Sequence, residues 1–226
     1  MIAFVVHRLL QSVLVMLAVA FISFALFRYI GDPVLIMLGQ DFTREQYEML
    51  VRDLGLDQPF YVQFAKFVVS AVQGEFGISY RLARPVAQLI AERLPATLEL
   101  SLVAALLALS IGVPMGVYTG LRRDSWLSRF FLTISLVGVS LPTFLIGILL
   151  ILVFAVQFGV LPSFGRGDVV RFGTWSTGFL TTSGLKALVL PAVTLSLFQL
   201  TLIMRLVRSE MLEVLRTDYI LSLIHI

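Results

Sequence analysis

Apolar residues in this chain are gathered into four long runs that contain no charged residue, and the charged residues lie between them. The runs cover residues 9–27, 100–121, 130–165 and 187–204. A bilayer core about 30 Å thick is crossed by about 20 helical residues. The pattern therefore predicts an all-α, polytopic membrane protein with four transmembrane helices, at about 9–30, 98–121, 130–158 and 187–206.

Two of these runs allow more than one interpretation. Residues 130–165 are too many for one untilted crossing, and Gly159 and Pro162 predict that the helix ends near residue 158 and a loop follows. The first run could be a cleaved signal peptide, but it is long, and no small-x-small cleavage site follows Arg28. We therefore expect the first helix to be retained.

The segment 31–97 has the pattern of short helices. Thr43, with Gln46 three residues later, has the form of a capping box, and Gly55 is placed to end the helix that follows. A second helix is predicted over 59–74.

A third short helix is predicted after Pro85, with apolar residues on one side and polar residues on the other. It would lie in the outer membrane interface before the chain turns inward after Pro95, either as an anchor or as a docking surface. The whole of 31–97 is thus expected to be a helical extracytoplasmic segment.

The composition supports a lipid environment. Hydrophobic residues make up 58% of the chain and charged residues 14%, and the mean hydropathy is +0.96. Soluble proteins average roughly 45–50% apolar and 25% charged residues, so the excess apolar surface should face lipid. The net charge of +3 does not indicate nucleic-acid binding, because the charges lie at membrane boundaries and not on one face.

The positions of Lys and Arg predict the orientation in the membrane. Basic residues crowd two short segments, after the second run and after the fourth: Arg122, Arg123, Arg129, Arg205, Arg208 and Arg216. Such segments are usually cytoplasmic, which places the N-terminus inside and segments 31–97 and 162–186 outside. The bias is modest, because 162–186 also carries Arg166, Arg171 and Lys186.

No catalytic or metal-binding residues are predicted. His7 and His225 lie at opposite ends of the chain, and there is no paired-His spacing and no Cys. No Gly-Lys dipeptide is present, so the chain has no P-loop for phosphates. If the protein uses ATP, another chain must bind it.

Prolines within the apolar runs mark a candidate solute path. A proline frees the carbonyl four residues before it, and in a membrane such a group must face protein or water. Polar residues share helical faces with two of these prolines, and the path candidates are Ser140, Pro142, Thr143, Thr194 and Thr201. The alternative is ordinary close packing of small residues between helices.

A charged helix from Arg205 to Ile220 is predicted to continue inward from the fourth transmembrane helix. Its periodicity alone favours a solvated extension of that helix.

Several motifs, in one order along the chain, carry a family resemblance. They are Gly31-Asp32-Pro33, Leu54-Gly55-Leu56-Asp57-Gln58-Pro59, Gly74-Glu75-Phe76-Gly77-Ile78-Ser79, Arg93-Leu94-Pro95-Ala96-Thr97-Leu98-Glu99-Leu100, Ser140-Leu141-Pro142-Thr143-Phe144, Leu161-Pro162-Ser163-Phe164-Gly165, and Arg208-Ser209-Glu210-Met211-Leu212-Glu213-Val214-Leu215 followed by Asp218-Tyr219-Ile220. Over residues 1–220 the chain resembles the permease subunit of the dipeptide, oligopeptide and nickel class of binding-protein-dependent ABC importers.

The resemblance implies six membrane helices in a prokaryotic cytoplasmic membrane, and transport of a peptide or related solute by alternating access. It implies a second homologous permease, two cytoplasmic ATPases that bind ATP and Mg, and an extracytoplasmic solute-binding protein. It also assigns ATPase coupling to the end of the charged helix and the loop after it, at Arg208, Glu210, Glu213, Asp218, Tyr219 and Ile220. The alternative is a passive channel or receptor without an ATPase.

The chain departs from the family pattern after Ile220. Residues 221–226 lack the expected Ala-rich continuation and are interpreted as an atypical tail produced by truncation or mis-assembly. Without a fifth and a sixth helix, we expect this form not to transport.

Overall fold

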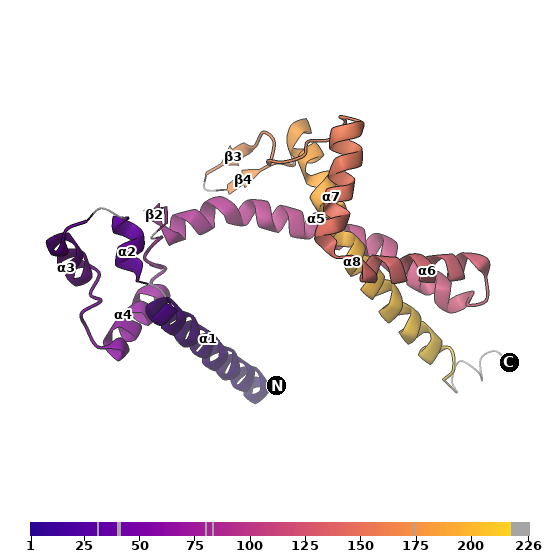
Figure 1. Ribbon diagram of the computed structural model, residues 1–226. Coiled ribbons are helices and arrows are strands. Elements are labelled where there is room, and N and C mark those ends of the chain that lie inside the picture. Colours follow the sequence, from indigo (N-terminus) through magenta and orange to yellow (C-terminus); the bar gives the residue numbers. More distant parts are fainter. Residues whose placement is uncertain (31, 40–41, 80, 83, 174, 218–226) are drawn as a thin grey trace. The chain divides into compact units, whose positions relative to one another are not determined.

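The computed structural model describes residues 1–30, 32–39, 42–79, 81–82, 84–173 and 175–217. The chain divides into two compact units, residues 1–90 and 91–226. Both are mainly helical (Figure 1), as predicted. The apolar pattern did not predict two short antiparallel ribbons, which pair β1 (Ile78–Ser79) with β2 (Arg84–Pro85) and β3 (Val170–Phe172) with β4 (Trp175–Thr177).

Aromatic side chains join two helices of the first unit, α1 (Ile2–Ile30) and α4 (Phe60–Val72). Phe24 of α1 lies against Phe60 and Phe64, with ring centroids 5.4 and 5.7 Å apart. Aromatic pairs at this spacing are favourable beyond their apolar contact. Most of α1 remains exposed within the chain, as expected of a helix that faces lipid or a partner.

The first predicted helix, 9–30, lies within α1, which extends it toward the N-terminus as far as Ile2. Polar and charged side chains in the added turns contact residues of the same helix. The Arg8 guanidinium lies 5.4 Å from the centre of the Phe4 ring, and Gln11 is within hydrogen-bond distance of His7.

The predicted capping box at Thr43 is confirmed. It opens α3 (Arg44–Asp53), where the Thr43 hydroxyl accepts from the Gln46 amide and the Gln46 side chain accepts from the Thr43 amide. Gly55 follows the helix at φ +66°, a conformation that favours glycine. The predicted second helix is α4, which begins after Pro59.

Asp32 connects the two shortest helices of the first unit. Its carboxylate caps α2 (Pro33–Leu38) by accepting from the Val34 amide at 2.9 Å. The other carboxylate oxygen accepts from the Tyr47 hydroxyl of α3 at 2.7 Å. The pKa of the Tyr47 phenol lies above its usual value. The main cause is this hydrogen bond, and desolvation of the phenol is the second cause.

The predicted turn after Pro95 is wrong, because α5 runs without a break from Val86 to Leu121. A proline inside a helix removes one hydrogen bond, which would favour an end there. Here Pro95 is buried together with Glu99 and Ala104, and this packing offsets the lost bond. The expected boundary between an outer segment ending at residue 97 and a helix beginning at 98 therefore lies within one helix.

The predicted single helix over 130–158 is also wrong. The structure has α6 (Trp126–Ser140), then α7 (Thr143–Leu150), which continues as the π-helix η1 (Ile151–Gln157). The break falls at Pro142, which lacks an amide hydrogen and has an extended backbone, φ −58° and ψ 135°. Proline also disfavours helical geometry at the preceding residue, Leu141.

Both α6 and α7 pack against α8 (Thr182–Val214) in the second unit (Figure 1). The fourth predicted helix, 187–206, is thus extended at both ends, and the charged segment continues the same helix as far as Val214. Within the described residues, α1, α5 and α8 are long and apolar enough to cross a membrane. The apolar helices α6 and α7–η1 are each shorter than that.

Glycines bring α5 close to α8 along what we call the α5–α8 seam: Gly112, Gly116 and Gly120. A Cβ at Gly116 would lie 2.6 Å from the Val207 Cβ and 2.8 Å from the Met204 carbonyl oxygen. Small residues four positions apart allow such close approach between membrane helices.

Candidate functional site

The five path candidates fall into two groups in the second unit. Thr194 and Thr201 lie on α8 where it meets glycines of the neighbouring helices. A Cβ at Gly147 of α7 would lie 3.4 Å from the Thr194 methyl, and one at Gly138 of α6 would lie 3.1 Å from the Thr201 hydroxyl. Each Thr hydroxyl donates to a carbonyl of its own helix. These contacts favour the alternative interpretation, close packing between helices.

The other three candidates lie at the break between α6 and α7. Ser140, Pro142 and Thr143 are exposed, and the Ser140 hydroxyl donates to the Leu136 carbonyl at 2.8 Å. The structure therefore does not bring all five residues to one polar surface.

An apolar hollow of about 350 Å³ lies beside this break. Residues of α5, α6, α7, η1 and α8 line it, and its polar lining includes Ser135 and Thr201. Arg205 of α8 reaches the Ser135 hydroxyl at 3.5 Å. The hollow is thus lined mainly by apolar side chains, and one arginine reaches a buried serine of its lining.

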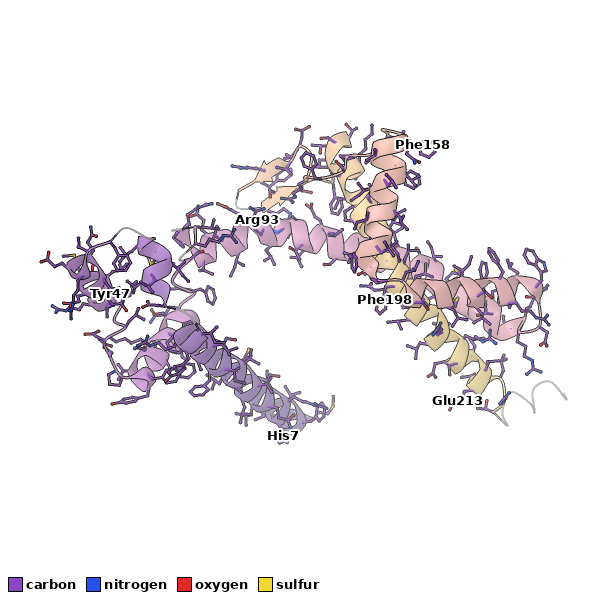
Figure 2. All side chains as sticks on the ribbon, viewed as in Figure 1. His7, Tyr47, Arg93, Phe158, Phe198 and Glu213 are labelled. Atoms are coloured by element: carbon purple, nitrogen blue, oxygen red, sulfur yellow. The ribbon has the colours of Figure 1, made fainter. Side chains whose placement is uncertain are left out.

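The coupling candidates Arg208, Glu210 and Glu213 lie in the last turns of α8, and Glu213 is labelled in Figure 2. Both glutamates are exposed, and neither forms an ion pair with another described residue. One nitrogen of Arg208, Nη1, is buried without a hydrogen-bond partner. This end of α8 therefore offers charges to a partner.

The remaining coupling candidates, Asp218, Tyr219 and Ile220, lie outside the described residues, as does the tail 221–226. Their predicted role stays a prediction.

The structure also shows a buried ion pair that the sequence analysis did not identify, here called the Glu99–Arg166 clamp. Glu99 of α5 is 3% exposed and accepts from Arg166 at 3.0 Å and from the Gly178 amide at 3.2 Å. Arg166 also donates to the Ser176 hydroxyl and carbonyl, at 2.7 and 2.6 Å. The clamp therefore ties α5 to the loop and ribbon between η1 and α8.

A weak signal for this clamp is present in the sequence. Glu99 ends the motif that starts at Arg93, and Arg166 follows the motif that ends at Gly165. The two residues are 67 positions apart, so the sequence alone does not predict that they form a pair.

Two family models match the chain. Residues 1–101 match the N-terminal membrane component of binding-protein-dependent transport systems, and residues 112–223 match the inner membrane component of the same systems. The chain belongs to this family. It is accordingly a multi-pass inner-membrane permease subunit of an ABC importer, and not an enzyme.

Individual relatives agree with this assignment. The permease is 39% identical over 221 residues to a putative peptide transport system permease protein of Brucella abortus, covering 97% of this chain and 68% of the relative. It is 37% identical to a di/tripeptide transport system permease protein of Pseudomonas aeruginosa and 33% identical to a dipeptide transport system permease protein of Alkalihalophilus pseudofirmus. In both cases the match covers 97% of this chain and 70% of the relative.

Proposed function

We propose that this permease passes peptides across the inner membrane by alternating access, together with a second homologous permease. In this proposal an extracytoplasmic solute-binding protein delivers the peptide, and two cytoplasmic ATPases that bind ATP and Mg drive the conformational change. The observation that carries the proposal is the match, along nearly the whole chain, to permeases named for peptides, dipeptides and di/tripeptides.

The proposed topology has the N-terminus in the cytoplasm and four crossings. These are α1, α5, the pair formed by α6 and α7–η1, and α8. The clustered arginines near residues 122–129 and 205–216 support this orientation, since basic short segments are retained on the cytoplasmic side. The clamp and the segment 31–97 then lie at the extracytoplasmic face, and the end of α8 lies at the cytoplasmic face.

The end of α8 is the proposed contact with an ATPase. Glu210 and Glu213 are exposed there at the end of one continuous helix of 33 residues. A continuous helix moves largely as one body, so a displacement of its charged end would reach the α5–α8 seam.

Uptake by the assembled importer tests this function. The permease used in the test carries the fifth and sixth helices that the family resemblance implies. Proteoliposomes that contain it with its partner permease, the ATPases and the binding protein should accumulate a labelled dipeptide when ATP is enclosed. They should not do so when a non-hydrolysable analogue replaces ATP. Equal uptake in both cases would instead indicate a passive channel.

A further inference from the structure

A second hollow, of about 380 Å³, lies between the first part of α5 and the β3–β4 ribbon. Three arginines line it, Arg93 of α5 with Arg166 and Arg171 of the loop and ribbon, together with Glu92 and Trp175. We call it the arginine hollow. Figure 2 labels Arg93 on α5, next to the ribbon.

The three guanidinium groups are held differently. Arg166 is positioned by the clamp, and its Nε–H is buried without an acceptor. Arg93 and Arg171 are exposed, and neither forms an ion pair or a side-chain hydrogen bond within the described part of the chain. The Arg166 side chain is therefore held in place. The guanidinium groups of Arg93 and Arg171 have N–H donors that no described residue accepts from.

Like charges around one concavity repel each other unless an anion joins them. Arginines outnumber the single carboxylate in the lining of this hollow. An excess of one sign of charge in a concavity raises the local concentration of the opposite charge. Guanidinium groups suit a carboxylate in particular, because their paired N–H donors match its two oxygens. The hollow thus has the chemistry of a carboxylate site.

We propose that the arginine hollow binds the terminal carboxylate of a peptide, an inference that rests on the proposed function. Its volume lies within the roughly 300–1,000 Å³ typical of small-molecule sites. Trp175 supplies an apolar wall for a peptide side chain. A small peptide with one free carboxylate matches this volume and this excess of arginines.

Binding to the assembled importer in nanodiscs, without the binding protein, tests the proposal. The probes are dialanine and its C-terminal amide, which differ in the carboxylate. We expect the free acid to bind about tenfold more tightly or better, as expected for hydrogen bonds to a charged group. Arg171→Gln should remove most of that preference, and Arg93→Gln part of it, since both side chains are exposed and outside the clamp. Arg123→Gln, in the loop between α5 and α6, is the matched control.

Equal binding of acid and amide, or a preference unchanged by Arg171→Gln, would refute the proposal. So would an Arg171→Gln variant that loses affinity for the binding protein but keeps the preference, because the hollow would then receive an acidic side chain of that partner. ATP-dependent uptake is measured separately. Intact uptake without the preference would overturn this site and leave the proposed function standing.

Discussion

At the scale of single residues, the Glu99–Arg166 clamp is a buried ion pair with several hydrogen bonds. A carboxylate that is 3% exposed is held by a guanidinium and a backbone amide. Burying a charge is costly without such partners, so removal of either side leaves the other uncompensated. The clamp stabilises the connection between α5 and the segment that leads into α8.

We expect Arg166→Gln to lower the free energy of unfolding by about 2–4 kcal/mol, because it leaves the Glu99 charge buried. The double variant Glu99→Gln/Arg166→Gln should cost less than the sum of the two single variants. Thermal unfolding of the four proteins in a double-mutant cycle measures this coupling.

The exposed pair Arg44–Glu48 on α3, with side chains 91% and 50% exposed, is the control, and its coupling should be about 0.5 kcal/mol or less. A clamp that couples no more strongly than this surface pair would contradict the assignment.

Two threonines separate the two interpretations of the candidate path. Thr143 is exposed at the break after α6, whereas Thr194 packs against Gly147. A solute path predicts that Leu at either position reduces peptide uptake severalfold while the importer still assembles. Close packing predicts instead that Leu crowds the facing helix and reduces assembly. We expect the first effect for Thr143→Leu, at the exposed break, and the second for Thr194→Leu, against Gly147.

Uptake rate and co-purification of the partner subunits are the two measurements. Thr133→Leu is the control, since Thr133 is an exposed residue of α6 whose hydroxyl likewise donates to its own helix. Unchanged uptake kinetics in both variants would remove these residues from the path.

At the scale of elements, close approach between helices organises the second unit. The glycines of α5 leave room for the backbone of α8, and α6 and α7 meet the same helix through Gly138 and Gly147. Helix α8 therefore contacts each of its neighbours at small residues. The break at Pro142 and the π-helix η1 add two irregular points to the wall beside it, and π-helical turns often occur at functional sites.

Gly116→Ala tests the α5–α8 seam. The new Cβ would lie 2.6 Å from the Val207 Cβ, so the two helices must separate, and overpacking of this kind costs about 1–3 kcal/mol. Gly147→Ala is the matched variant, because its Cβ would make an ordinary contact at 3.4 Å and alanine favours a helix. We expect a lower unfolding temperature for Gly116→Ala only. Equal unfolding temperatures would show that α5 and α8 are not in close contact.

At the scale of the whole molecule, the exposed apolar surface implies lipid and partner subunits around this permease. Helix α1 has no buried residue in its most apolar window, and α5 and α8 are largely exposed along theirs. A protein with such a surface would aggregate in water. In a membrane, lipid tails and neighbouring transmembrane helices cover the apolar side chains. The charged end of α8 is the contrasting feature, because its two exposed carboxylates have no ion-pair partner among the residues that the structure describes.

We expect charge reversal at that end, Glu210→Lys/Glu213→Lys, to weaken capture of the partner ATPase at least severalfold in a pull-down. Glu45→Lys on α3 is the control, because it changes an exposed charge of the first unit.

The orientation in the membrane has its own test. The chain contains no Cys, so labelling of a single cysteine placed at Arg123 shows on which side of the membrane that position lies. Capture unchanged by the double reversal, or labelling of position 123 from the outside, would contradict the proposed coupling and orientation.

The sequence by itself determined the helical membrane class, the capping box at Thr43, the helix that begins after Pro59 and the family. These features depend on composition and on residues close together in the chain, whose physical preferences act locally. The same local rules misjudged prolines. Pro95 predicted a break that burial prevents, and Pro142 was placed inside a helix that it divides.

Only the tertiary structure decided which distant residues meet. It joined Glu99 to Arg166, placed Thr194 against Gly147, and brought Arg93 to the hollow that Arg171 lines. Such pairings depend on how helices cross and how loops return to them. Neither property can be obtained from the spacing of residues along one chain.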